Sequence, residues 1–83
     1  MRDDLDKLNY REVIDDIEYT CSYNLFRHGV HLSVQYGFYK VKRFISFRNN
    51  PIIGITAVIN KNFKEMKEEV LEYYDTVYAS IDK

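Results

Sequence analysis

The sequence is poor in residues that crosslink, kink or interrupt a chain. Its 83 residues include one cysteine, one proline, three glycines and no tryptophan. The single cysteine, Cys21, excludes an intrachain disulfide and favours a reducing compartment. The chain has no apolar run of about 20 residues that would cross a bilayer, and its acidic N-terminus differs from the basic start of a signal peptide. We therefore expect a cytoplasmic protein that does not enter the membrane.

The length limits the size of the fold. A chain of 83 residues is sufficient for one domain around one hydrophobic core. Such a chain buries about 60–65% of the surface that it exposes when unfolded, so we expect modest stability. We treat residues 1–83 as one small interaction domain, and we expect residues 1–8 to form a loosely ordered acidic segment.

Charge is segregated along the chain, although the net charge is only −1. Residues 1–18 contain seven acids and three bases, and residues 19–64 contain seven bases and no acid. The remaining residues, from Glu65 onward, contain six acids and two bases. This acidic, basic, acidic order is the most informative feature of the composition.

Residues 10–28 carry the signals of an amphipathic helix. Asn9 is a favoured N-cap residue, and Glu12 stands at the third helical position, where it completes a capping box. Gly29 is a typical residue just beyond a helix C-terminus. Apolar residues recur at helical spacing, at Tyr10, Val13, Ile14, Ile17, Cys21 and Leu25. We predict a first helix over residues 10–28.

The apolar period changes to two after Gly29, which predicts strands. Apolar and polar residues alternate over 30–36 and, after a turn near Gly37, over 39–48. Arg43 falls on the apolar face of the second strand, so we expect a bulge or a snorkelling side chain there. The β-branched run at 52–59 predicts a third strand after the turn at 49–51.

A second helix is predicted at the C-terminal end. Asn62 is a candidate N-cap with Glu65 three residues later, and the apolar face runs from Phe63 to Ile81. The element order is then αβββα. The fold class is α+β, with a three-stranded antiparallel sheet and both helices packed on one face.

Catalytic and metal-binding patterns do not stand out. His28, His31 and Cys21 are too few and wrongly spaced for a structural zinc site, and no local signature supports a Cys–His nucleophile. The carboxylates fall mostly on solvated helix faces, so no acid and base pair is evident. We expect a protein that is not an enzyme and has no metal or cofactor.

The strand at 39–48 suggests a surface for nucleic acid. On the side of the sheet away from the helices, cations would surround one aromatic ring that can stack on a base. The proposed contacts are Lys40, Lys42, Phe44, Arg48, Lys61 and Lys64. The αβββα order, with Lys61, Lys64 and Lys67 at the start of the last helix, resembles the double-stranded-RNA-binding domain, although the KKxAK run of that family is absent. A plain solvated sheet face is the alternative explanation.

A second candidate surface lies on the predicted first helix. Aromatic residues continue the acidic face, opposite the core stripe, and an aromatic patch rimmed by acids is typical of a protein-binding site. The proposed contacts are Glu12, Asp15, Tyr19, Tyr23 and Phe26. The alternative is that the helix is buried on both faces between the sheet and the second helix.

The predicted third strand has apolar residues on both faces, which would make an exposed sheet edge prone to pairing. Pairing with a second copy would cover it, so we expect a homodimer through Ile53, Ile55, Thr56 and Ile59. Together these features favour a small, non-catalytic protein-binding module. In size and surface character it resembles the small inhibitors encoded by phages and other mobile elements, including anti-CRISPR proteins. An RNA- or DNA-binding module is the alternative.

Overall fold

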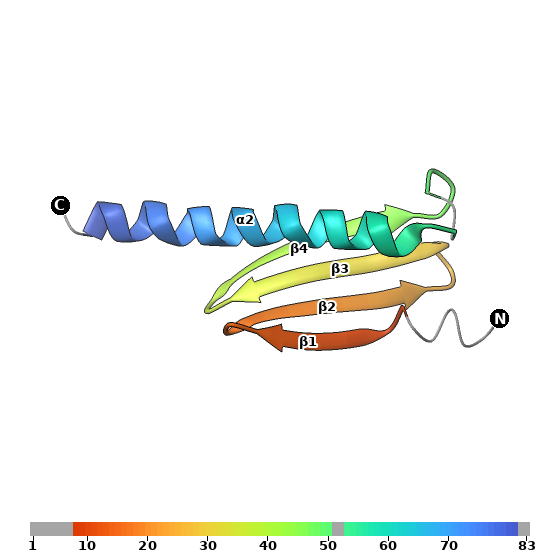
Figure 1. Ribbon diagram of the computed structural model, residues 1–83, viewed down its shortest axis with the longest axis horizontal. Helices are drawn as coiled ribbons and strands as arrows, with labels where there is room; N and C mark the ends of the chain where they lie inside the picture. Colours follow the sequence, from red (N-terminus) through yellow and green to blue (C-terminus); the bar gives the residue numbers. More distant parts are fainter. Residues whose placement is uncertain (1–7, 51–52, 82–83) are drawn as a thin grey trace.

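The computed structural model describes residues 8–50 and 53–81. Strands β1 (Tyr10–Ile14), β2 (Ile17–Asn24), β3 (Gly29–Tyr36) and β4 (Tyr39–Ser46) form one antiparallel sheet in chain order. Helix α2 (Ile55–Ile81) follows and packs against β3 and β4 on one side of the sheet (Figure 1). A helix of 27 residues is about 40 Å long. An eight-residue strand spans only about 27 Å, so the helix extends past the end of the sheet.

Tight turns set the register of the four strands. Asp15 and Asp16 both have positive φ angles, 54° and 67°, as the two-residue turn between β1 and β2 requires. Gly37, with φ 62°, begins the equally short turn between β3 and β4. The longer β2–β3 loop is closed by Asn24, whose Oδ1 accepts the Arg27 backbone N–H at 3.0 Å.

The core lies between the sheet and α2. Alternate residues of β2, β3 and β4 point toward the helix, and one stripe of the helix points back. The buried side chains from the sheet and the segments flanking it are Leu8, Ile17, Cys21, Val30, Leu32, Val34, Ile45 and Phe47. Those from α2 are Ile55, Ile59, Phe63, Met66, Val70 and Tyr74.

The α+β class is confirmed. The strands predicted over 30–36 and 39–48 are also confirmed, and the second of them ends at Ser46 in the structure. The helix predicted over 10–28 is wrong, because these residues form the β1–β2 hairpin and the following loop. Asn9 does not cap a helix: its Oδ1 accepts the N–H of Tyr23, across the sheet, at 3.0 Å. The residues from Ile17 to Tyr23 fit both a helical spacing and a period of two. The turn at Asp15 and Asp16 pairs them with β1, so they form a strand.

The strand predicted over 52–59 is also wrong for its described part. Gly54, with φ 84°, precedes α2, and its carbonyl accepts the N–H groups of Ala57 and Val58. A β-branched run is compatible with a buried helix start when one of its faces packs on a sheet, as Ile55 and Ile59 do. Asn62 therefore lies inside the helix rather than at its cap. The order is ββββα, so the likeness to the double-stranded-RNA-binding domain, which rested on αβββα, is lost.

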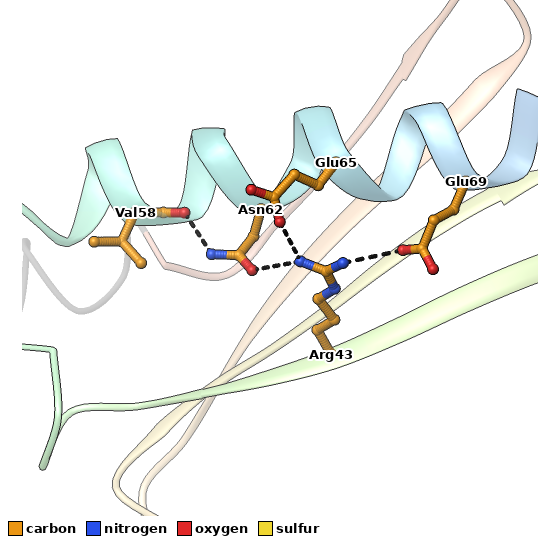
Figure 2. Close-up of polar contacts among 5 residues, drawn as sticks. All are labelled: Arg43, Val58, Asn62, Glu65 and Glu69. Atoms are coloured by element: carbon orange, nitrogen blue, oxygen red, sulfur yellow. Dashed lines mark hydrogen bonds and ion pairs between the residues drawn. The ribbon is translucent and has the colours of Figure 1, made fainter.

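Arg43 shows why no bulge is needed in β4. It stays in register opposite Leu32 and points toward α2. Its guanidinium donates to Asn62 Oδ1 at 2.9 Å, and it pairs with Glu65 at 2.8 Å and Glu69 at 3.1 Å (Figure 2). Asn62 in turn donates to the Val58 carbonyl at 2.8 Å. These contacts fix the rotation of the helix over the sheet.

This cluster predicts an acid-sensitive contact between sheet and helix. The hydrogen bond from Arg43 lowers the pKa of Glu65 below its ordinary value of 4.5. A carboxyl with a lowered folded-state pKa stabilises the protein above 4.5, and that contribution is lost as the pH falls through the folded pKa. We expect Glu65→Gln to remove this part of the acid sensitivity, measured as the change in urea midpoint between pH about 6 and about 3. Glu68→Gln, on the exposed side of the same helix, is the control and should leave the pH dependence as in the parent.

Candidate functional site

On its helix side the sheet is covered except along β1. Helix α2 lies over β3 and β4 (Figure 1). All five residues of β1 are exposed. Tyr10, Glu12 and Ile14 stand opposite Cys21, Tyr19 and Ile17 and so share the side of the sheet on which α2 packs. Tyr10 is 37% exposed and Ile14 is 48% exposed.

A groove separates this uncovered strip from α2. Its volume is about 180 Å³. We call it the β1–α2 groove, and its lining residues are Tyr10, Glu12, Ile14, Tyr19, Asn60 and Phe63. The Phe63 ring makes edge-to-face contacts with Tyr19 at 5.4 Å and with Tyr10 at 6.4 Å between centroids. The groove therefore has an aromatic wall built from both the sheet and the helix.

The groove also lies in the field of nearby carboxylates. Burial, followed by the charges of Asp15 and Glu12, raises the pKa of Tyr19. Burial, together with Cys21 and Glu12, raises the pKa of Tyr10. Both phenols can donate hydrogen bonds. An aromatic groove with acids beside it favours an apolar ligand that carries positive charge at its edge.

The structure keeps some of the predicted protein-binding residues together and separates others. Glu12 and Tyr19 line the β1–α2 groove, and Asp15 lies in the adjacent β1–β2 turn. Tyr23 instead stacks on Phe47 at 5.8 Å on the core side of the sheet. Phe26 is 98% exposed, but it lies in the β2–β3 loop at the other end of the strands. The predicted continuous helical face does not exist, because these residues belong to a hairpin.

Four groove residues, Tyr10, Ile14, Asn60 and Phe63, are not among those predicted from the sequence. Tyr10 and Ile14 belong to the core stripe of the helix predicted over 10–28, and Phe63 belongs to the core-facing side of the C-terminal helix. The alternation of β2 is the signal for Tyr10 and Ile14, because it turns Tyr19 toward α2 and the β1 residues paired on that side lie beside it.

The opposite face of the sheet carries no helix in the described part of the chain. We call it the open face. It consists of alternate residues of the four strands: Arg11, Val13, Glu18, Thr20, Ser22, Asn24, His31, Ser33, Gln35, Lys40, Lys42, Phe44 and Ser46. A depression of about 370 Å³ lies on it, lined mainly by hydroxyls, lysines and two rings. The open-face residues around it are Thr20, Ser22, His31, Ser33, Lys40, Lys42 and Phe44.

The ring of Phe44 is the centre of a small cluster on this face. Its centroid lies 4.9 Å from that of His31, and the Arg27 guanidinium carbon lies 4.3 Å from it. Asn24 Nδ2 lies 3.1 Å from His31 Nε2. Because Asn24 Oδ1 accepts the Arg27 N–H, the Asn24 side chain bridges the β2–β3 loop and the His31 ring.

The predicted nucleic-acid residues are divided between two layers. Lys40, Lys42 and Phe44 share the open face, as the alternation of β4 predicted, while Arg48 follows the strand and is exposed. Lys61 and Lys64 lie on the outer side of α2, away from the sheet. A single flat ligand therefore cannot contact both groups of lysines.

The residues predicted for a dimer edge do not form one. Ile55 and Ile59 belong to α2 and are buried between the helix and the sheet, whereas Ile53 precedes the helix, Thr56 lies in its first turn, and both are exposed. The strand-edge argument for a dimer no longer applies, because the described part of this segment is helical.

The remaining possibilities considered from the sequence are a reactive cysteine, a metal site and a membrane span. Cys21 is 1% exposed, and burial raises the pKa of its thiol to about 11, so it is a core residue rather than a nucleophile. Among residues 8–50 and 53–81, no group of three His, Cys, Asp or Glu side chains is arranged to hold a metal ion. Within the same ranges, no helix is both long and apolar enough to cross a membrane.

Comparison with known proteins supplies no relative, since no family model, curated protein or solved structure matches the chain. Function is therefore inferred from the two surfaces themselves.

Proposed function

We propose that this protein is a non-catalytic protein-binding module that holds an amphipathic helix of its partner in the β1–α2 groove. The observation that carries the proposal is that β1 exposes Tyr10 and Ile14 beside the covered strands of the same sheet. In an isolated domain, such a strip exposes apolar side chains to water next to a preformed aromatic wall.

The dimensions of the sheet support a helical ligand. Four strands spaced about 4.8 Å apart span about 14 Å from the first strand to the last, whereas packed helices are about 10 Å apart. On this side α2 packs over β3 and β4, and Ile17 and Cys21 of β2 are also buried, so β1 is the strand left for a partner helix to lie against. A partner helix beside α2 would contact Tyr10 and Ile14 on β1 and Phe63 on α2.

Charge defines the expected partner further. Glu12 lies in the groove, and Asp15 and Asp16 lie in the turn at the end of β1. A ligand helix with an apolar stripe flanked by Lys or Arg would match both features. Binding of this kind masks the partner without altering it chemically. The module would then act as a stoichiometric inhibitor, the class that its size and surface resemble.

Neighbouring residues of β1 provide a matched test. Ile14 faces the groove and Val13 faces the open side, and both are about half exposed, at 48% and 58%. Ligands would be selected from a displayed library of helical 20-residue peptides, and their affinities measured by titration calorimetry. Ile14→Asp should weaken binding at least about tenfold, whereas Val13→Asp should change it less than about twofold.

Selected peptides are expected to carry apolar residues three and four positions apart with Lys or Arg beside them. Equal losses from the two substitutions would contradict the proposal, as would selected peptides without an apolar stripe. Circular dichroism of both variants would show that the fold is retained.

A further inference from the structure

We propose that the open face is a second binding site, independent of the β1–α2 groove, and that it takes single-stranded nucleic acid along β4. The two sites lie on opposite sides of the same sheet. Occupying one therefore leaves the other accessible.

The distribution of charge on the open face is one-sided. Lys40 and Lys42 are both exposed on β4, and Arg27 lies close by in the β2–β3 loop. Among the described residues of β3 and β4, the open face contains no acid. The acid of the face, Glu18 on β2, is paired with Arg11 at 3.1 Å, which leaves the lysines uncompensated. The net potential along β4 favours an anion.

The depression beside these lysines provides hydrogen-bond donors as well as charge. Thr20 stands opposite Ser33, which in turn stands opposite Lys42, so two hydroxyls and an ammonium form one row across three strands. Hydroxyls and lysines are common contacts to phosphate oxygens. The volume, about 370 Å³, lies within the range of sites that hold a small ligand or one nucleotide unit.

The next row supplies stacking surfaces. Ser22, His31 and Phe44 stand side by side, with the Arg27 guanidinium over the Phe44 ring at 4.3 Å. Aromatic rings and guanidinium planes are the platforms on which unpaired bases stack. Arg27 is held there by its loop, because Asn24 accepts its backbone N–H. A base beside Phe44 would place its phosphates near Lys42 and Lys40.

The arrangement favours a single strand over a duplex. The cations follow one strand of the sheet, with Lys40 and Lys42 about 6.8 Å apart along β4. Lys61 and Lys64, which would be needed to broaden the basic surface, lie on the other layer. Bases in a duplex are also unavailable for stacking on the Phe44 cluster.

The inference is tested by fluorescence anisotropy with labelled 20-nucleotide oligo(dT) and oligo(U), and with a duplex of equal length. Salt would be varied from about 50 to about 300 mM. We expect single strands to bind at least tenfold more tightly than the duplex. Lys42→Ala and Lys40→Ala should each reduce the slope of log affinity against log salt by about 0.7, as expected for one lost phosphate contact.

Lys64→Ala is the matched control, since it removes an exposed lysine from α2, and it should leave the slope unchanged. Phe44→Leu keeps an apolar side chain but removes the ring, and it should weaken binding at least fivefold with the salt slope retained. Absence of binding at about 50 mM salt would overturn the inference, and so would equal effects of Lys64→Ala and Lys42→Ala. Tighter binding of the duplex than of the single strands would also overturn the inference. So would complete displacement of the labelled oligonucleotide by an equal concentration of a mononucleotide. None of these outcomes bears on the β1–α2 groove, which is tested by Ile14→Asp.

Discussion

Met66→Ala is expected to lower the free energy of unfolding by about 2–5 kcal/mol, the range for truncating a large buried side chain. Met66 is 0% exposed and lies in the centre of the α2 stripe, between Phe63 and Val70. A domain of this length has a total stability of only about 4–12 kcal/mol, so the variant should be close to unfolding at room temperature. Urea denaturation followed by circular dichroism measures the change.

Leu71→Ala provides the comparison within the same helix. Leu71 is 36% exposed, and its truncation should cost less than about 1 kcal/mol because little apolar surface is lost from the core. Similar midpoints for the two variants would mean that α2 presents a different stripe to the sheet from the one described.

Gly37→Ala is expected to destabilise the protein by about 2–3 kcal/mol for two separate reasons. Gly37 has φ 62°, a conformation that alanine adopts only with strain. In addition, a β-carbon at this position would collide with the hydroxyl of Tyr74, which accepts the Phe38 N–H at 3.0 Å. Tyr74 is 8% exposed and packed against the ring of Tyr36, so its ring has little freedom to move aside.

Two companion variants separate these causes. Gly54→Ala has a similar backbone strain, with φ 84°, but no described atom lies within 4 Å of the added carbon, so it should cost only about 1 kcal/mol. In a Tyr74→Phe background the collision with the hydroxyl is removed, and Gly37→Ala should become less costly by about 1 kcal/mol. Equal costs for Gly37→Ala and Gly54→Ala in the parent would show that the Tyr74 contact does not limit position 37.

The parts of the fold that the sequence predicts are those with one unambiguous period. In β3 the apolar residues alternate cleanly, in β4 they alternate except at Arg43 and Phe44, and the later part of α2 has a continuous helical stripe. Ile17 and Cys21, in contrast, satisfy both periods, because a spacing of four residues fits a helix face and also one side of a strand. The deciding feature is the turn at Asp15 and Asp16, where a two-residue hairpin needs positive φ angles that are more often supplied by Asn or Gly.

Prediction of the candidate surfaces follows the same division. Lys40, Lys42 and Phe44 were placed on one face because the alternation of a single strand is enough to group them. The β1–α2 groove joins residues about 50 positions apart, Tyr10 and Phe63, and its existence depends on how far α2 extends across the sheet. No local pattern contains that information. How much of the sheet stays uncovered depends on how α2 packs across it.

The resulting molecule has two different surfaces supported by one sheet. The helix side of β1 is apolar and aromatic with acids nearby, whereas the open face of β3 and β4 is basic and polar. The exposed apolar residues of the first surface favour a ligand, because Tyr10 and Ile14 lie beside a groove rather than being scattered singly.

The most direct measurement of the central claim is a two-dimensional NMR titration of the labelled protein with the tightest selected helical peptide. The account predicts that the backbone amides of Tyr10, Glu12, Ile14 and Asn60 shift together and saturate at one equivalent. The amides of Ser33, Lys40 and Lys42 should stay in place. Shifts centred on Ser33 and Lys42, or confined to the loop around Phe26, would contradict the claim that the groove between β1 and α2 is the protein-binding site.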